Sequence, residues 1–288
     1  METKRPWSSR AKTEGSGVMA MQQEKALAWQ VGVWDRISQM YLREVDRRFL
    51  PVVDHIIRRA NLRTGNKVLD LGTGTGAVAL QAAPLVGPSG RVTGADISTD
   101  MLDLARKRAA ELGHANLDFQ EGGAEVILAE DASFDAVLAS LILMYVIDRA
   151  AAARECARVL RPGGRFVASV WARPEECDIV LFQQTAGRFA PPPPVPGVGP
   201  GALADPEPFI SQLAEAGIDA SVETESLGFD FDDFSTAWEV LAGVTTAALD
   251  PERREEAKAA VQAVMWPGGV GPRHFRNVTQ FIVGRRRG

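Results

Sequence analysis

The sequence contains few residues of the types that build disulfide frameworks or metal sites. Its 288 residues include two cysteines, three histidines and two tyrosines. Cys156 and Cys177 cannot form the disulfide framework of a small secreted domain, and so low a cysteine count suits a reducing compartment. Neither cysteine has the partners expected of a zinc site. We therefore expect both to be packing residues, no bound metal, and a cytoplasmic protein.

Long apolar runs are also missing. No uninterrupted apolar stretch approaches the roughly 18 residues needed to cross a bilayer, so no membrane span is expected. The first 20 residues mix basic side chains with serine and glycine and have no apolar core of the signal-peptide kind. We predict that residues 1–21 form a flexible tail.

Excess positive charge is absent too. The formal net charge is −5 and the sequence pI about 5.4, which argues against a dedicated nucleic-acid surface. Apolar residues make up 45% and charged residues 24% of the chain, as in ordinary soluble globular proteins. No internal repeat or strong domain boundary is visible. We therefore predict one domain over residues 22–288, in a monomer or homodimer.

What the sequence does contain is a glycine-rich stretch, KVLDLGTGTGA, at residues 67–77. Val68, Leu69 and Leu71 are typical of a buried strand, and Gly72, Gly74 and Gly76 of a loop that turns into a helix. Glycine permits tight turns and removes the Cβ that would keep a ligand away from the main chain. The helix start that follows offers free amide donors, so the pattern indicates a nucleotide-binding turn.

Strands and helices alternate after this turn. This rhythm predicts a parallel sheet covered by helices on both faces. Further strands are expected at residues 91–95, 116–120, 134–139 and 165–171, and helices at 78–86, 98–112 and 149–160.

The flanking segments are less regular. Residues 22–49 predict a helix with several large side chains, either packed on the main domain or acting as a substrate lid, and Pro51 suits the first turn of a second helix. Residues 191–200 (PPPPVPGVGP) predict a stiff connector. The remaining expected elements are helices at 206–216, 233–249 and 251–265 and strands at 219–224 and 277–285.

Two acidic residues follow the first two strands. Asp70 lies at the carboxyl end of strand one and Asp96 at the end of strand two. In an open parallel sheet, ligands bind outside the carboxyl ends of the strands. A carboxylate after strand two can accept hydrogen bonds from both hydroxyls of a ribose. A turn with two helix-capping acids is the alternative interpretation.

Dinucleotide and S-adenosylmethionine sites share these features. Gly72, Gly74 and Ala77 fit the dinucleotide pattern G-x-G-x-x-A. However, Asp70 beneath the loop would repel a diphosphate, whereas S-adenosylmethionine brings an ammonium and a sulfonium that favour a carboxylate. A Tyr-x-x-x-Lys element for hydride transfer is also missing, because Tyr145 is followed by VIDR.

Four ordered motifs resemble a known family. They are VLDLGTGTG at 68–76, ADIS at 95–98 with Met101 after it, SFDAVLAS at 133–140 and LRPGGRF at 160–166. Together they are similar to class I S-adenosylmethionine-dependent methyltransferases of the small-molecule, ubiquinone/menaquinone-biosynthesis-like branch. The resemblance covers roughly residues 50–172.

The resemblance implies an α/β fold: a Rossmann-like, doubly wound, mostly parallel seven-stranded sheet with an antiparallel last strand. N-terminal helices (22–60) and late-inserted segments (173–288) would form a lid over the cofactor-binding core (61–172). It also implies S-adenosyl-L-methionine as cofactor. The residues expected to bind it are Asp70, Gly72, Thr73, Gly74, Gly76, Asp96, Ile97, Met101, Gly123, Ala124 and Ser140.

One position departs from the family pattern. The family usually has an acid just after strand three that faces the adenine amino group, and here Gly123 stands in its place, within EGGAE at 121–125. Either the backbone at Gly123 and Ala124 makes this contact, or Glu121 or Glu125 substitutes. Met101 has a plain alternative role in helix packing.

The acceptor side is weakly specified by the sequence. Trp34, Tyr41 and Tyr145 are candidate acceptor contacts, and Tyr145 and His274 are weak candidates for the catalytic site. His55 and His114 are expected to be structural or exposed. A sulfonium methyl is already activated, so alignment of the acceptor should supply most of the catalysis.

The functional hypothesis is methyl transfer to a small, largely apolar acceptor by in-line displacement. Two alternatives stay open, namely a catalytically silent S-adenosylmethionine-binding scaffold or regulator and an NAD(P)-dependent oxidoreductase. Methylation of nucleic-acid bases is disfavoured, because SLILMY at 140–145 lacks the Asn/Asp-Pro-Pro-aromatic element of such enzymes.

Overall fold

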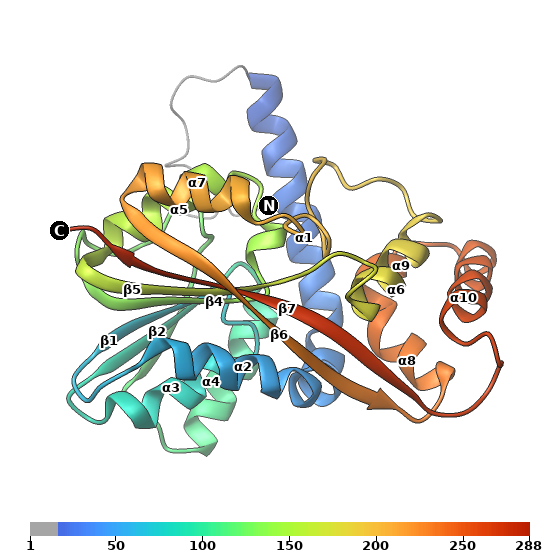
Figure 1. The fold of residues 1–288 in the computed structure, drawn as a ribbon, viewed down its shortest axis with the longest axis horizontal. Coiled ribbons are helices and arrows are strands. Elements are labelled where there is room, and N and C mark those ends of the chain that lie inside the picture. Colours follow the sequence, from blue (N-terminus) through green and yellow to red (C-terminus); the bar gives the residue numbers. More distant parts are fainter. Residues whose placement is uncertain (1–16) are drawn as a thin grey trace, which may run out of the picture.

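The fold is a seven-stranded sheet flanked by helices, seen in a computed structural model that describes residues 17–288 (Figure 1). The strand order is β3-β2-β1-β4-β5-β7-β6. All neighbours pair in parallel except β7, which is antiparallel to β5 and to β6. The strands are β1 (Lys67–Leu71), β2 (Arg91–Asp96), β3 (Leu117–Glu121), β4 (Phe134–Ser140), β5 (Leu160–Trp171), β6 (Ile218–Phe231) and β7 (Arg273–Arg286). The predicted fold class is confirmed.

Helices cover both faces of this sheet. In Figure 1, α2, α3 and α4 lie on one face and α5 and α7 on the other. The inner strands are apolar on both sides, and Val68 and Leu69 of β1 are fully buried, as expected of a covered parallel sheet. The bounds are α2 (Asp46–Ala60), α3 (Ala77–Val86), α4 (Thr99–Glu111), α5 (Arg149–Val159) and α7 (Glu207–Ala216).

Several predicted helix ends are confirmed by their caps. The Ser98 side chain accepts a hydrogen bond from the Met101 backbone N–H at the start of α4. Asp250 caps α10 (Pro251–Met265), with Pro251 in the first turn. Gly217 ends α7 in the left-handed conformation, φ +97°. These three helices begin or end close to the predicted residues, because caps and left-handed glycines satisfy free backbone groups at helix ends.

The N-terminal segment differs from the prediction. The structure has α1 (Gly17–Met40), a π-helical turn η1 (Tyr41–Val45) and α2 in direct succession. Pro51 therefore lies inside α2 and not in its first turn. The predicted tail over 1–21 falls mostly outside the described residues, and its last five residues belong to α1. The π-turn joins the two helices without a break, which residue periodicity alone does not reveal.

The C-terminal half is also more regular than predicted. β6 and β7 pair along all 14 residues of each strand, whereas the sequence predicted shorter strands at 219–224 and 277–285. The predicted helix 233–249 is divided into α8 (Phe234–Leu241) and α9 (Gly243–Thr246), and α6 (Asp178–Gly187) was not predicted. Long β6 and β7 carry the buried Phe231 and Phe275 out to α8 and α6, so tertiary packing extends them.

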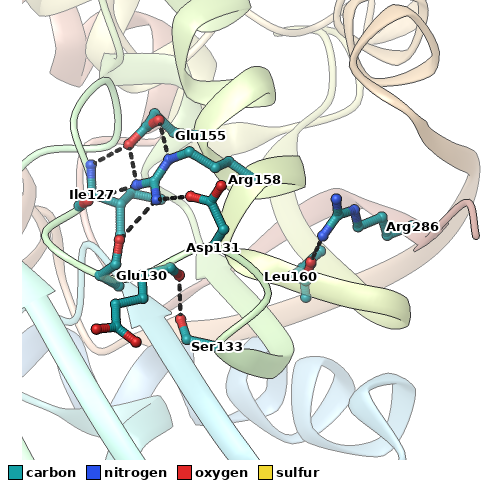
Figure 2. Close-up of polar contacts among 9 residues, drawn as sticks. Ile127, Glu130, Asp131, Ser133, Glu155, Arg158, Leu160 and Arg286 are labelled. Atoms are coloured by element: carbon teal, nitrogen blue, oxygen red, sulfur yellow. Dashed lines mark hydrogen bonds and ion pairs between the residues drawn. The ribbon is translucent and has the colours of Figure 1, made fainter.

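One arginine anchors the connection between β3 and β4. The Arg158 guanidinium on α5 donates to the Ile127 and Ala129 carbonyls and to the Asp131 and Glu155 carboxylates at 2.7–2.9 Å (Figure 2). Glu155 in turn accepts from the Ile127 backbone N–H at 2.8 Å. These hydrogen bonds hold residues 127–131, which follow the cavity-lining residues 122–125, against α5. Within residues 17–288, no helix is long and apolar enough to cross a membrane.

Candidate functional site

The main cavity lies at the carboxyl ends of β1, β2, β3 and β4. It encloses about 1120 Å³ of empty space, including the part open to solvent. Its walls come from the loops after these four strands and from side chains of α1, η1 and α2. The expected crevice of an open parallel sheet is therefore present and is covered by the N-terminal helices.

The glycine loop forms one wall, and two of its glycines are required for different reasons. Gly72 has φ +67°, and a Cβ there would lie 2.2 Å from Ile142 Cγ2. Gly74 has φ +54°, and a Cβ there would meet nothing within 4 Å. The first glycine permits close packing against the loop after β4. The second leaves space beside the main chain that a ligand can fill.

Gly76 is not among the residues that line the cavity, so its contact with the cofactor stays a prediction. It has φ +86° at the start of α3, and an added Cβ would lie 3.2 Å from Ala105 Cβ and 3.5 Å from Phe119 Cζ. Gly76 therefore serves the packing of the loop against α4 and β3. The alternating Gly-Thr pattern in the sequence could not separate this role from that of its neighbours.

Asp70 is a buried carboxyl beneath the loop. Its Oδ2 accepts from Thr73 Oγ1 at 2.6 Å and from the Ala79 backbone N–H at 3.0 Å. Its Oδ1 is buried and has no hydrogen-bond partner among the residues that the structure describes. Burial raises the pKa of Asp70 to about 7. A cation in the cavity would give Asp70 Oδ1 a partner and would lower the pKa of this carboxyl.

Asp96 is the second buried carboxyl of the cavity. Its Oδ2 accepts from the Gly74 backbone N–H at 2.8 Å and its Oδ1 from the Ser98 backbone N–H at 2.9 Å. Burial raises the pKa of Asp96, and these backbone donors partly offset the shift. Each carboxylate oxygen has a second lone pair. Asp96 thus holds the glycine loop in place and keeps acceptor capacity for a ligand hydroxyl.

Most other predicted cofactor residues also line the cavity. Of the two candidate acids after β3, Glu125 lines it and Glu121 does not. Glu125 Oε1 accepts from the Ile147 backbone N–H at 3.1 Å, and burial raises the Glu125 pKa. The remaining predicted residues that the structure brings to the cavity are Thr73, Ile97, Met101, Gly123, Ala124 and Ser140.

Aromatic rings form another wall of the cavity. The Trp34 ring meets the Tyr145 ring edge to face, with centroids 5.0 Å apart and planes at 89°. Trp34 also meets Tyr41 at 6.3 Å and 83°, and Tyr41 meets Phe49 at 6.4 Å and 80°. All four rings line the cavity, so the three predicted acceptor residues are brought together and Phe49 joins them. The chain's two tyrosines both lie here.

The turn that carries Tyr145 is held from three sides. It is η2 (Leu143–Tyr145), directly after β4. Gln30 Nε2 on α1 donates to the Tyr145 carbonyl at 2.7 Å. Arg149 on α5 donates to the Leu143 and Met144 carbonyls, and the Gly199 backbone N–H donates to the Met144 carbonyl at 2.9 Å. The proline-rich connector therefore helps to fix the aromatic wall.

His274 is not among the residues that line the cavity, so its part in the catalytic site stays a prediction. His274 lies in β7 with its side chain 62% exposed and its Nδ1 2.8 Å from Asp230 Oδ1. His55 stacks on Phe281 outside the cavity. His274 is the second residue of the 14-residue strand β7, which begins at Arg273. Its nearness to the last strand in the sequence therefore did not show where along that strand its side chain lies.

A partly buried ion pair that the sequence did not indicate joins α2 to the glycine loop and α4. Asp46 on α2 accepts from Thr75 Oγ1 at 2.6 Å and from Arg108 Nη1 at 2.7 Å. Arg108 also donates to the Thr75 carbonyl at 2.7 Å. Burial raises the pKa of Asp46. No short motif links residues this far apart in the sequence, so only the fold reveals this contact.

Leu141 was also missed. It follows β4, lines the cavity and adopts a left-handed backbone, φ +59°. A leucine in this region costs about 1–2 kcal/mol. Its backbone N–H donates to the Ser169 carbonyl and hydroxyl at 3.0 and 3.1 Å, which holds the turn. Strained residues of this kind gather at functional sites.

Known proteins match the chain in two ways. Residues 62–185 match a family model described as a methyltransferase domain. Over 119 residues the chain is 40% identical to the ubiquinone/menaquinone biosynthesis C-methyltransferase UbiE of Hahella chejuensis, covering 41% of this chain and 48% of that protein. The chain thus spans about half the length of the curated relatives that it matches.

Solved structures share the fold over a larger part of the chain. The YcgJ protein of Bacillus subtilis superposes with a TM-score of 0.61 at 22% identity, covering 82% of this chain and 98% of that one. A geranyl diphosphate methyltransferase in complex with S-adenosylmethionine superposes at 0.51 and 17% identity, covering 83% and 85%. At such identities the likeness concerns the fold alone.

Proposed function

We propose that the chain is a class I S-adenosylmethionine-dependent methyltransferase that transfers a methyl group from this cofactor to a small, largely apolar acceptor, as the match of residues 62–185 to a methyltransferase domain supports. The observation that carries the proposal is the divided cavity. One part of the lining is a glycine loop with two buried carboxyls, and another part is made of aromatic rings. A small acceptor bound between them would face the methyl donor in a space shielded from water.

The donor wall suits the chemical groups of S-adenosylmethionine. The free Asp70 Oδ1 can accept from the cofactor's ammonium, and Asp96 can accept from its ribose hydroxyls. The space beside Gly74 admits a ligand against the main chain. Ile97, Met101 and Glu125 all line the cavity. Ile97 and Met101 would contact the adenine, and Glu125 would accept a hydrogen bond from its amino group. Glu125 would then substitute for the acid that Gly123 replaces.

The acceptor wall would act by binding and orientation. The bound cofactor supplies an activated methyl group, so the protein mainly has to align the acceptor and exclude water. Correct alignment can lower the barrier by about 7–11 kcal/mol. Burial raises the pKa of Tyr41 and of Tyr145. Both phenols therefore stay protonated near neutral pH and can donate to a polar group of the acceptor.

The relatives support the donor half more than the acceptor half. The matched family model spans residues 62–185, whereas Trp34, Tyr41 and Phe49 precede it in the sequence. The name of the Hahella protein assigns that protein to C-methylation in quinone biosynthesis. For this chain we carry over the methyl donor and a small acceptor with a large apolar surface, and we derive the rest from the cavity.

Titration calorimetry tests the donor assignment. We expect S-adenosylmethionine to bind with one-to-one stoichiometry and NAD(H) not to bind. Binding of NAD(H) without S-adenosylmethionine would overturn the proposal and favour an oxidoreductase. A transfer assay with a radiolabelled cofactor methyl group and a panel of small apolar acceptors then tests turnover. Cofactor binding with no transfer to any acceptor would instead indicate a silent scaffold or regulator.

A further inference from the structure

The rings of the aromatic wall meet edge to face around Trp34 and do not form a flat stack. Trp34 stands nearly perpendicular to both Tyr41 and Tyr145, at 83° and 89°. The three rings come from α1, η1 and η2, three separate elements. A box of rings that line a cavity can present π-faces, which carry partial negative charge, to one bound group. Such surroundings bind organic cations.

The charge of the cavity lining has the same sign. Among the residues that the structure describes, the charged side chains lining the cavity are all carboxyls, namely Asp46, Asp70, Asp96 and Glu125. Asp46 lies on the same helix as Phe49, and its charge contributes to the raised pKa of Tyr41. Burial raises the pKa of each of the four. Asp46 is already paired with Arg108, and the other three carboxyls are assigned above to the cofactor. The lining therefore offers no cationic side chain to an anionic acceptor and would repel it.

We propose that the acceptor is an amine, and that Trp34, Tyr41 and Tyr145 form a box that binds its nitrogen and stabilises the positive charge that this nitrogen gains on methylation. This inference rests on the proposed function and specifies its acceptor. Aromatic rings interact more strongly with a cation than with the neutral amine, so the box stabilises the transition state and product more than the ground state.

The chemistry of amine methylation needs no base in the bond-forming step. The nitrogen lone pair forms the new N–CH3 bond while the C–S bond breaks and its electron pair goes to sulfur. The products are S-adenosylhomocysteine and a methylammonium ion. Where the nitrogen carried hydrogen, a proton can leave to solvent afterwards. A carbon or hydroxyl acceptor would instead lose its proton during the reaction and would gain no positive charge for the box to stabilise.

The test compares two probes of the same shape that differ in charge. Choline carries a trimethylammonium group, and 3,3-dimethylbutan-1-ol carries a tert-butyl group in its place. Calorimetry on the full chain saturated with S-adenosylhomocysteine should show choline binding about tenfold or more tightly than the neutral alcohol. Equal binding, or tighter binding of the alcohol, would overturn the inference.

Two substitutions in α1 distinguish the loss of the aromatic box from a general disturbance of the fold. Trp34→Leu should abolish the preference for choline, while Trp29→Leu should leave it unchanged, because the Trp29 side chain is 39% exposed and lies outside the cavity. Retained discrimination in Trp34→Leu would contradict the role of the box. If Trp34→Leu fails to fold, the more conservative Trp34→Phe should still reduce the preference, and an unchanged preference in that variant would also overturn the inference.

Turnover distinguishes this inference from the proposed function. Aryl-alkyl amines should be methylated, and the matching alcohols and carboxylates should not. Methylation of the alcohols or of a ring carbon, without methylation of the amines, would leave the proposed function intact and refute the amine inference. Failure to bind S-adenosylmethionine would refute both.

Discussion

The donor wall and the acceptor wall of the cavity are built by different means. On the donor wall, backbone groups and carboxyls that follow β1, β2 and β3 hold one another, as in the bond from the Gly74 N–H to Asp96. On the acceptor wall, side-chain rings from α1, η1 and η2 meet through ring contacts. The first wall is specified by short motifs. The second depends on where distant helices come to rest.

This difference indicates which wall should vary in function. A wall built from backbone groups tolerates few substitutions. Any other residue at position 72 would place its Cβ 2.2 Å from Ile142 Cγ2. Ring positions can change size and polarity while the helix that carries them stays in place. The donor wall should therefore fix the cofactor and the acceptor wall should select the substrate. The predictions below separate these roles, beginning with the largest expected effect.

Loss of Asp96 should break the donor wall. Asp96→Ala removes an acceptor for the Gly74 and Ser98 backbone N–H groups as well as the expected partner of the ribose hydroxyls. We expect the cofactor Kd from calorimetry to rise by about 100-fold or more, since buried donors lose a charged acceptor. Asp100→Ala, an exposed change in the first turn of α4, is the matched control. Retained affinity in Asp96→Ala would refute the ribose assignment.

Loss of Trp34 should break the acceptor wall only. Trp34→Leu removes the ring that contacts both tyrosines. Because central aromatic anchors contribute most to recognition, kcat/KM for the acceptor should fall by about 10- to 100-fold. The cofactor Kd should stay within about threefold, since the residues expected to bind the cofactor, such as Asp70 and Gly74, belong to the donor wall. A large rise in cofactor Kd, absent from Trp29→Leu, would show that the two walls cannot be separated.

Asp46 joins α2 to the glycine loop and α4, so its loss should affect stability before chemistry. Asp46→Ala leaves the partly buried Arg108 guanidinium without its carboxylate and frees Thr75 Oγ1. We expect the free energy of unfolding, measured by urea titration, to fall by about 1–3 kcal/mol. Asp54→Ala, on the exposed face of the same helix, should change it by less than about 0.5 kcal/mol. Equal losses in both variants would argue against the junction.

Cofactor affinity should depend on pH through Asp70. Its pKa in the free protein is about 7, so the carboxyl is increasingly protonated below that pH and cannot pair with the cofactor's ammonium. Affinity should fall by up to about tenfold between pH 7.5 and pH 6. Because the folded pKa lies above the unfolded value of 3.8, the same group makes the free energy of unfolding decrease as pH rises from about 4 to 7.

The matched variant for this pH dependence is Asp70→Asn, which keeps the shape of the side chain and cannot titrate. Its cofactor affinity should be weaker than that of the wild type at pH 7.5 and nearly constant down to pH 6. A wild-type affinity that is flat over this range, or a variant whose profile still follows that of the wild type, would contradict the role assigned to Asp70.

The smallest effect is expected for His274. His274→Ala removes an exposed side chain paired with Asp230 far from the cavity, so kcat, KM and cofactor Kd should each stay within about twofold of the wild type. The pH–rate profile should also be unchanged. A loss of kcat of tenfold or more would mean that His274 takes part in the reaction after all.

The sequence was informative where function depends on local chain geometry. Several features act on backbone groups or side chains only a few residues away in the sequence. They are the turn after β1, the acids at the ends of β1 and β2, and the Ser98 and Asp250 caps. Asp46, Phe49 and Leu141 could not be predicted, because their roles arise from contacts across the fold or from a left-handed backbone at a leucine. Gly76 and His274 lie outside the cavity lining, because Gly76 packs against α4 and β3 and His274 lies at the start of β7.

The position of bound S-adenosylhomocysteine in a crystal structure tests the division of the cavity most directly. We predict that the ribose hydroxyls lie within hydrogen-bond distance of Asp96, the amino group near Asp70 Oδ1, and the sulfur toward the box formed by Trp34, Tyr41 and Tyr145. A nucleoside seated among these three rings, with the carboxyls of Asp70 and Asp96 left without ligand contacts, would contradict the assignment of the two walls.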